Sequence, residues 1–243
     1  MRKLFGVLVA AVALMAFSLP VFAQDEVPTI AEVVVASATG ESPEFTTLLA
    51  AVQAADPAVL EALSNPEASL TVFAPTDAAF AALGEETLNA VLADQAMLTD
   101  ILLFHVLGSQ VMSTDVVAGL EGGAFSTATL QGQYIDVAQT DMGITINGAN
   151  LVTVDITAPN GVIHVIDAVI LPETRTIAEI VVDLASMEEG AEFTSLLAAV
   201  QAADPAVLEA LSDSEAELTV FAPTDAAFAA LGEETLNAVL ADQ

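Results

Sequence analysis

The letters TVFAPTDAAF occupy residues 71–80 of this chain and return unchanged at residues 219–228. In each copy an apolar stretch runs into a proline, followed by threonine and aspartate, which are both good caps for the start of a helix. Apolar residues at helical spacing come next, as at Ala79 and Phe80. The pattern predicts a buried strand that turns directly into a helix, twice in one chain.

The repetition extends on both sides of this stretch. Residues 45–95 and 193–243 differ at only four of 51 positions. Both copies also open with Thr-Ile-Ala-Glu, at Thr29 and at Thr176, so the repeat unit is about 147 residues long. The chain is therefore built from two copies of one unit.

The two copies differ in extent. The first continues through Pro172, whereas the second reaches Gln243 at the point where that continuation would begin. We therefore expect a complete domain over residues 24–172 and a truncated second domain over residues 173–243.

Helices come first and strands later in the repeat unit. A capping box that begins at Thr29 opens the first helix, and Asp56 caps a third helix. Asn147 and Gly148 predict a hairpin. The other expected helices cover residues 45–52, 76–83, 85–92 and 96–104, and the expected strands cover residues 70–74, 111–112, 125–130, 134–138, 144–146, 151–156 and 162–171. This order is typical of an α+β domain, and the second copy keeps only the helical half and one strand.

The amino terminus predicts an export signal at residues 1–23. Arg2 and Lys3 precede an apolar run over residues 4–22, and the small residues at its end fit a cleavage site. An uncleaved membrane anchor is the alternative, because the run is near the minimum length that spans a bilayer. We expect a secreted protein without a stable membrane span after cleavage, and periplasmic and cell-surface locations stay open.

The charge of the chain excludes one class of partner. There are 34 acidic residues against 3 basic ones, and signal cleavage would leave Arg175 as the single base. Such a surface repels phosphate backbones, so we expect no nucleic-acid partner. We interpret the acidity as a solvated surface, because no stretch has the alternating ligands of an EF-hand loop, and bridging by divalent cations is the alternative.

The composition argues against catalysis. The chain has no cysteine, no tryptophan, one tyrosine and two histidines, which removes thiol nucleophiles, thiolate zinc sites and the aromatic platforms of sugar-cleaving sites. Neither a nucleophile elbow nor a complete phosphate-binding loop occurs. We therefore expect no enzyme, no cofactor and no metal site.

Three motifs carry a family resemblance. Residues 71–80 resemble the first signature of the fasciclin (FAS1) domain family, and NGVIHVIDAVILP at residues 160–172 resembles the second. Between them, residues 102–107 are similar to the family's Tyr-His motif, with Phe104 in place of tyrosine. The resemblance covers residues 28–172.

The resemblance implies wedged β-strands with a helical layer, and a secreted, non-enzymatic role in adhesion through cell-surface or matrix proteins or glycans. It also implies that Phe104 and His105 belong to a partner-binding motif. The residues alone favour another interpretation, because His105 lies within an apolar run and is expected to be a buried, hydrogen-bonded histidine. We expect His164, which alternates with apolar residues on a strand, to be structural as well.

Asp155 and Ile156 form a second candidate motif. In the animal branch of the family, an Asp-Ile pair at this position belongs to integrin-recognition sequences. Asp155 would then coordinate a divalent cation held by the receptor, while Ile156 fills an apolar notch. The alternative is structural: Asp155 caps the end of a strand and Ile156 is part of the core.

Two further questions stay open. One is whether a group of apolar residues near the expected helix-sheet junctions binds a lipid or pigment or fills an ordinary core; the group is Met97, Leu98, Met112, Phe125 and Met142. The other is the half repeat. It is explained by an incomplete sequence, by an apolar face that promotes self-association, or by exchange of helical halves between molecules.

Overall fold

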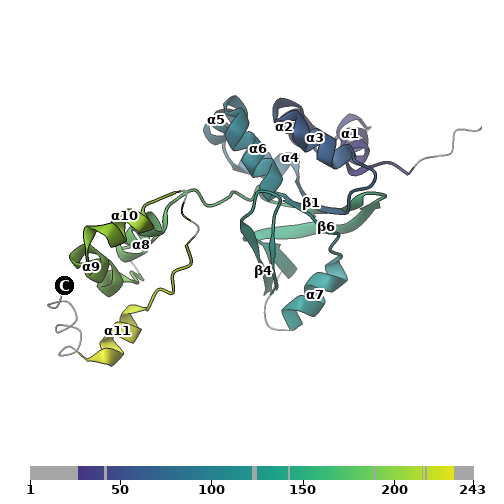
Figure 1. Cartoon of the computed structure of the whole chain (residues 1–243). Coiled ribbons are helices and arrows are strands. Elements are labelled where there is room, and N and C mark those ends of the chain that lie inside the picture. The colour runs from purple at the N-terminus through teal and green to yellow at the C-terminus, as the bar shows by residue number, and fades with distance from the viewer. Residues whose placement is uncertain are drawn as a thin grey trace, which may run out of the picture. The chain divides into compact units, whose positions relative to one another are not determined.

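The computed structural model describes residues 27–40, 43–121, 125–141, 143–188, 190–214, 216 and 218–232. The chain divides into two compact units with the boundary between Leu171 and Pro172 (Figure 1). The expected export signal at residues 1–23 and the expected junction residue Met142 lie outside the described residues.

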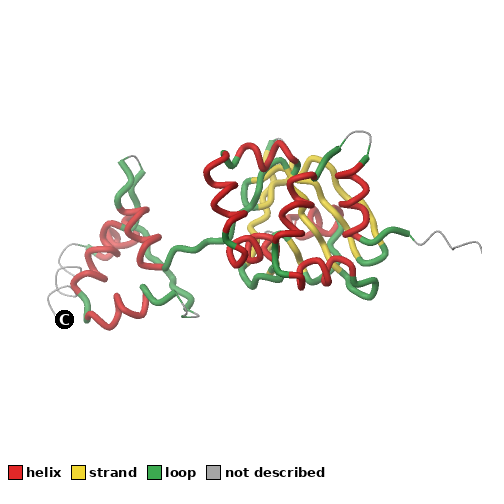
Figure 2. Tube along the Cα trace, turned by 90° about the horizontal axis from the view of Figure 1, so that it is seen from above, coloured by secondary structure: helices red, strands yellow, loops and turns green. Residues whose placement is uncertain are grey.

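The first unit begins with a helical layer. Its caps are local, as the sequence predicts: Thr29 and Glu32 form a reciprocal capping box, and the Asp56 carboxylate accepts a hydrogen bond from the N–H of Ala58. The helices are α1 (Ile30–Thr39), α2 (Thr46–Ala54), α3 (Pro57–Ser64), α4 (Asp77–Ala82), α5 (Glu85–Ala93) and α6 (Gln95–Phe104). Seen from above, these helices lie over the strands (Figure 2).

One seven-stranded sheet forms the other layer. Its order is β2-β1-β7-β6-β5-β4-β3, and only the β1–β7 pair is parallel. The strands are β1 (Leu70–Pro75), β2 (Val106–Leu107), β3 (Phe125–Ala128), β4 (Tyr134–Thr140), β5 (Gly143–Ile146), β6 (Ala149–Ala158) and β7 (Gly161–Ile166). Helices above an almost wholly antiparallel sheet confirm the α+β expectation.

Buried apolar residues form two clusters, one on each face of the sheet at β1 and β7. Leu70, Val72 and Ala74 of β1 pack with the helical layer. The intervening Phe73 packs on the other side, in a second cluster that includes Phe104. Because alternate residues of a strand point to opposite faces, β1 is buried on both.

Two predictions in the sheet region are wrong. Residues 111–112 form no strand, and the structure instead has a helix, α7 (Ser113–Glu121), which lies below the sheet in Figure 1. The strand expected over residues 162–171 ends at Ile166, because the next residue, Asp167, turns back to bind the backbone and side-chain nitrogens of Asn150. The Asn147–Gly148 hairpin between β5 and β6 is confirmed, since both residues have positive φ.

The second unit repeats the helical half. Among its described residues the helices are α8 (Ile177–Ala185), α9 (Thr194–Ala202), α10 (Pro205–Leu211) and α11 (Asp225–Leu231). The strand expected in this copy is not found, since residues 218–223 form neither a helix nor a strand and pair with no strand in the described part of the chain. The same letters form β1 in the first unit, so what is missing is a neighbouring strand rather than a sequence signal.

In the part of the chain that the structure describes, no single helix is long and apolar enough to cross a bilayer. The bent pair α5 and α6, which meet at 106°, is long and apolar enough when the two helices are taken together.

Candidate functional site

The strand β6 is irregular where it passes β7. Leu151 pairs with Ile166, Thr153 with Val165 and Ile156 with Ile163, so each step along β6 contains one residue more than the matching step along β7. These are two β-bulges, which bend a strand and re-aim its side chains. As a result Val152, Thr153 and Val154 are exposed in succession instead of alternating between core and solvent.

Asp155 lies in the second bulge with a left-handed backbone, at a φ of 59°. Its N–H donates to Nδ1 of His164 at 3.2 Å, and its carboxylate accepts from the N–H of Ser113 at 2.9 Å and from the Ser113 hydroxyl. The hydrogen bond from the Ser113 hydroxyl is the main cause that holds the pKa of Asp155 below its usual value. Asp155 therefore binds the start of α7, and does not cap a strand end as the structural alternative supposed.

His164 fixes this arrangement from the next strand. Its Nδ1 accepts the hydrogen bond from Asp155, so its Nε2 carries the proton and donates to the carbonyl oxygen of Val111 at 2.9 Å. The ring stacks on Phe73 with centroids 5.9 Å apart. The expectation that His164 is structural is confirmed, because the ring is buried and both nitrogens bind backbone groups.

The side chains around Asp155 divide into a buried and an exposed set. Ile156 is half-buried and packs against the core beneath the helices. Val152 and Val154 are 59% and 40% exposed. We call Val152, Val154 and Asp155 the bulge surface, since these three present two apolar groups and one carboxylate on a single strand.

Phe104 and His105 lie beneath the surface, with exposures of 1% and 3%. Nδ1 of His105 donates to the carbonyl oxygen of Ile101 at 2.7 Å, and Nε2 accepts from the N–H of Ile170 at 3.1 Å. Burial lowers the pKa of His105 to about 4, so the ring is neutral. The buried histidine expected from the residues is confirmed. No partner can touch either side chain while the unit is folded as described, so this pair supports the fold beneath the surface.

The first signature has a long-range role that the sequence did not reveal. Thr76 caps α4, but the Asp77 carboxylate accepts from the N–H groups of Thr46 and Thr47 at 3.1 and 2.8 Å and so caps α2. The N–H of Asp77 donates in turn to Glu44 at 2.8 Å. Burial alone would raise the pKa of Asp77, but these hydrogen bonds outweigh it and hold the pKa below its usual value. The signature therefore joins two helices across 31 residues.

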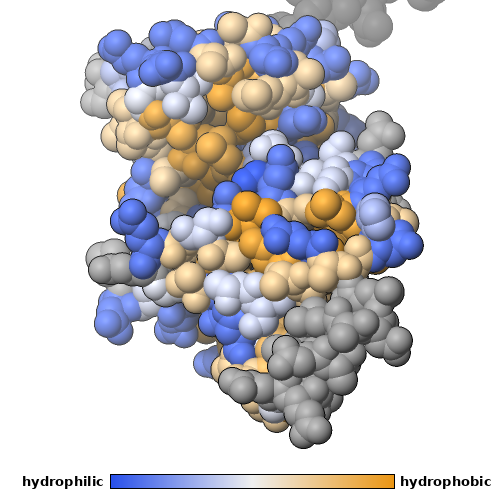
Figure 3. Space-filling model, turned by 90° about the vertical axis from the view of Figure 1, so that its left-hand side faces the viewer, coloured by the Kyte–Doolittle hydropathy of each residue, from blue (hydrophilic) through white to orange (hydrophobic). Residues whose placement is uncertain are grey.

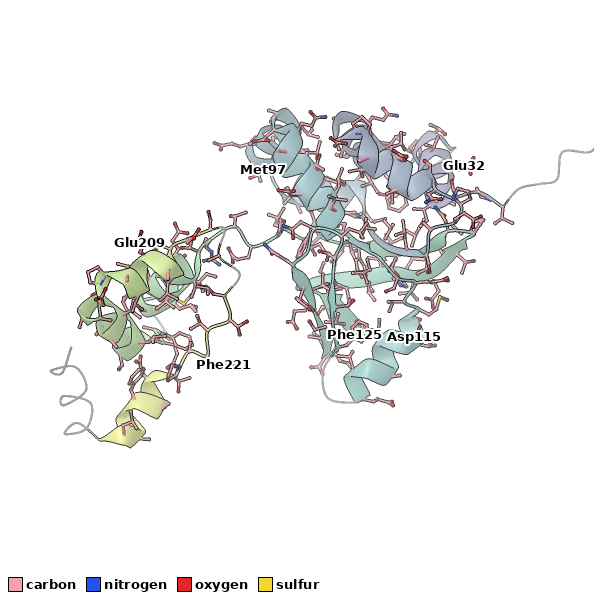
Figure 4. The ribbon with its side chains drawn as sticks, viewed as in Figure 1. Glu32, Met97, Asp115, Phe125, Glu209 and Phe221 are labelled. Carbon is pink, nitrogen blue, oxygen red and sulfur yellow. The ribbon has the colours of Figure 1, made fainter. Side chains whose placement is uncertain are left out.

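The expected ligand-pocket residues do not converge. Met97 is exposed on the outer side of α6, whereas Phe125 lies on β3 near α7 (Figure 4). The two apolar cavities described in the first unit have volumes of about 30 and 20 Å³, the size of a single water molecule. Among the described residues, no three His, Cys, Asp or Glu side chains gather closely enough to hold a metal ion.

Comparisons with known proteins give one family. The model of the Fasciclin domain matches residues 43–172 and 191–243. Protein sll1483 of Synechocystis is 40% identical over 152 residues, which cover 62% of this chain and 77% of that protein. Transforming growth factor-beta-induced protein ig-h3 of Sus scrofa is 37% identical over 138 residues, covering 56% of this chain and 19% of that protein.

Two further similarities extend this comparison. Immunogenic protein MPB70 of Mycobacterium bovis is 32% identical over 147 residues, covering 57% of this chain and 68% of that protein. A solved FAS1 domain pair from the insect cell adhesion molecule Fasciclin I has a TM-score of 0.44 and 18% identity, over 78% of this chain and 64% of that chain. This chain thus spans most of two bacterial relatives but about a fifth of the length of the pig protein.

Proposed function

Because this chain belongs to the fasciclin domain family, we propose that it is an extracellular, non-enzymatic adhesion or matrix-type protein that binds its partner through the bulge surface. The single observation that carries the proposal is that Val152 and Val154 of the bulge surface, and Thr153 between them, are exposed in succession on an inner strand of the sheet. Inner strands usually bury alternate residues. A bulge re-aims side chains, and here it leaves three successive residues exposed.

The bulge surface has the chemistry of a small recognition site. Val152 and Val154 are β-branched and held on a paired strand, so they lose little rotamer freedom when a partner covers them. Asp155 adds a carboxylate whose position is fixed by Ser113. The strain of its left-handed backbone, typically about 1–3 kcal/mol, is the kind that is retained at binding sites.

The partner that fits this surface has an apolar notch beside a positive group. That group is an amine, a guanidinium or a metal ion held by the partner, since Asp155 is the carboxylate of the bulge surface and is ionised at neutral pH. A cell-surface or matrix protein has such chemistry, and a polyanion does not. Ile156 contributes by packing against the core, which keeps the bulge in place.

The two histidines favour binding over catalysis. His105 and His164 are the only imidazoles in the chain, and both ring nitrogens of each bind backbone or bulge groups. Neither ring is directed at a serine or threonine hydroxyl as a base would be. The water-sized cavities of the first unit do not favour carriage of a lipid or pigment.

Adhesion measured with a matched pair of variants tests this proposal. The full chain is immobilised, and attachment of cells of the organism that produces it is counted for the parent and for Val152→Thr/Val154→Thr. The control is Val35→Thr/Val117→Thr, which changes two exposed valines on α1 and α7. We expect the bulge variant alone to lose attachment, and equal attachment of both variants would contradict the proposal.

Asp155→Asn separates charge from fold in the same assay. Asparagine tolerates the left-handed backbone and retains an oxygen for the N–H of Ser113, so the bulge should persist. We expect attachment to fall, and where a chelator lowers attachment of the parent it should no longer affect the variant. Secretion is tested separately, by locating the chain in the medium, the periplasm and the cell of the producing organism.

A further inference from the structure

Basic residues are almost absent from this chain. Residues 4–243 contain 34 acidic residues and a single basic one, Arg175. Hydrophilic residues are spread over the surface shown in Figure 3, and in residues 4–243 every charged one except Arg175 is acidic. A partner that recognises an arginine or lysine side chain therefore finds one site in these residues.

Arg175 lies in the segment that connects the two compact units. The boundary between the units precedes Pro172, and α8 begins at Ile177, where the connecting loop enters it in Figure 1. The residues between them form neither a helix nor a strand, and residues 173–175 are exposed. Exposed connections between domains are preferred sites of proteolytic cleavage.

Both neighbours of this segment are held by their own contacts. Ile170, shortly before it, is 2% exposed and donates its N–H to His105 of the first unit. Thr176, directly after Arg175, caps α8 and exchanges hydrogen bonds with Glu179. The bond between Arg175 and Thr176 therefore joins two structures that each secure their own end.

Two carboxylates hold the Arg175 guanidinium. Glu173 lies 2.6 Å from one of its terminal nitrogens and Asp183 lies 2.7 Å from the other. All three side chains remain roughly half exposed. Ion pairs at such exposure contribute little to the stability of a fold, so they do not explain why the single basic residue is at this position.

We propose that the bond between Arg175 and Thr176 is a processing site, cut by an extracellular endoprotease whose specificity pocket holds a carboxylate. A carboxylate in that pocket selects arginine or lysine before the cleaved bond, as in trypsin. Such an enzyme has one cleavable bond in residues 4–243, and cutting it separates the first unit from the second. The proposal does not depend on the bulge surface, which belongs to the first unit.

The reaction is the hydrolysis of one peptide bond. Water adds to the carbonyl carbon of Arg175, the bond to the nitrogen of Thr176 breaks, and an Arg175 carboxylate and a Thr176 ammonium group remain. The new ammonium group has a partner in place, since the N–H of Thr176 donates to the Glu179 carboxylate at 2.8 Å. The pair of Arg175 and Asp183 would then join two chains, and a single exposed pair is too weak to hold them together.

The start of α8 controls how readily this bond is cut. An endoprotease binds an extended stretch on both sides of the bond, so the first turn of α8 has to open before the protease can bind residues 176–178. Glu179 opposes this opening through the capping box that it forms with Thr176. When opening and closing are faster than cleavage, the cleavage rate follows the population of the open form. Weakening the capping box should therefore speed cleavage.

Limited digestion of the full chain with trypsin tests access to the bond. We expect one cut within residues 4–243, seen by mass spectrometry as a fragment that begins at Thr176. The Arg175→Gln chain should lack this cut. The fragment that holds the first unit should keep the parent's urea unfolding transition, followed by the fluorescence of Tyr134.

Matched variants test the control by α8. Glu179→Ala removes the capping box of α8 and should speed cleavage about threefold, whereas Glu32→Ala removes the capping box of α1 and should leave the rate unchanged. Glu173→Gln/Asp183→Asn releases the guanidinium and should speed cleavage about two- to fivefold. Each rate is divided by the rate for a synthetic peptide of residues 170–184 with the same change, which removes the protease's own preference for neighbouring residues. Equal rates for Glu179→Ala and Glu32→Ala would contradict the control by α8.

The organism that produces the chain supplies the second test. The parent and Arg175→Gln chains are added to its culture medium and to its intact cells, with and without an amidine inhibitor that fills carboxylate-bearing pockets. We expect a fragment whose first residue is Thr176 from the parent. No such fragment should form from the variant or in the presence of the inhibitor.

Three results would overturn the proposal. The first is a folded chain that trypsin leaves whole while it cuts the peptide of residues 170–184. The second is a fragment of the first unit without the parent's unfolding transition, because cleavage would then destroy the unit instead of releasing it. The third is a parent chain that stays whole with the organism's medium and cells, or an Arg175→Gln chain that is cut there at the same bond.

Discussion

Protonation of His105 is a perturbation whose cost follows from the surroundings of one side chain. The ring is 3% exposed, and its two nitrogens hold the carbonyl oxygen of Ile101 and the N–H of Ile170. Burial is the main cause that lowers its pKa from 6.5 to about 4. A second proton would charge a buried ring and remove the acceptor that Ile170 uses.

The direction and size of the effect follow from linkage. Between the folded pKa and the unfolded pKa of His105, the unfolded chain binds a proton that the folded chain does not, so acid favours unfolding. The stabilisation is fully present above the unfolded value and is lost as the pH falls toward the folded value. Between pH 7.5 and pH 5.0 the first unit should lose about 2 kcal/mol through this group.

Urea unfolding at a series of pH values measures this loss. Tyr134 is the chain's single tyrosine and the chain has no tryptophan, so intrinsic fluorescence reports on the first unit. His105→Gln is the reference, because it removes the titrating ring while His164 and the carboxylates remain. The variant should start about 1–3 kcal/mol less stable, since Ile170 loses a well-placed acceptor.

The prediction is tested by comparing how much the free energy of unfolding of the parent and of His105→Gln changes with pH. The parent should lose about 2 kcal/mol more than His105→Gln between pH 7.5 and pH 5.0. Equal losses would refute the reasoning, because the ring would then titrate in the folded state as it does in the unfolded one.

Three further predictions concern the fold. Asp77→Ala should lower the free energy of urea unfolding of the first unit by about 1–3 kcal/mol, because two N–H groups of α2 lose their acceptor. The matched Asp225→Ala should leave that transition unchanged. Equal effects of the two variants would contradict the role of Asp77 as the cap of α2. Gly161→Ala should prevent folding of the first unit, whereas Gly132→Ala, with open space around its Cβ, should lower the free energy of unfolding by about 1–2 kcal/mol. A Gly161→Ala chain that is folded by circular dichroism would contradict this prediction. With 34 acidic residues against 3 basic ones, the chain should unfold at a higher temperature in 1 M than in 0.05 M KCl, and sorbitol at equal osmolality should not reproduce the whole rise.

The helical half could be predicted from the sequence because its signals are local. The capping box at Thr29 and the Asp56 cap lie within three residues of the groups they bind. The hairpin at Asn147 and Gly148 is equally local, since two residues with positive φ close it. Such signals depend on no other part of the chain.

The bulge surface and α7 could not be predicted in the same way. The start of α7 at Ser113 is bound by Asp155, 42 residues later, and the exposure of Val152 and Val154 depends on the register of β6 against β7. A window of neighbouring residues contains neither relation. A left-handed Asp155 at a bulge becomes visible only when both strands are placed.

Residues 218–223 illustrate the limit of a strand signal. The same six letters form a buried strand in one unit and an unpaired segment in the other. The local preference is identical, so the difference lies in the presence of β7 on one side and β2 on the other. Strand formation is a property of the pair, which a single segment cannot specify.

Attachment of cells to the immobilised full chain tests the central claim most directly. Replacing the two valines of the bulge surface by threonine removes one methyl group each, and about 1 kcal/mol for each corresponds to at least a tenfold loss of affinity. We predict that Val152→Thr/Val154→Thr lowers attachment at least tenfold while the Val35→Thr/Val117→Thr control attaches like the parent. Attachment of the bulge variant at the parent's level, with an unchanged melting temperature, would contradict the account.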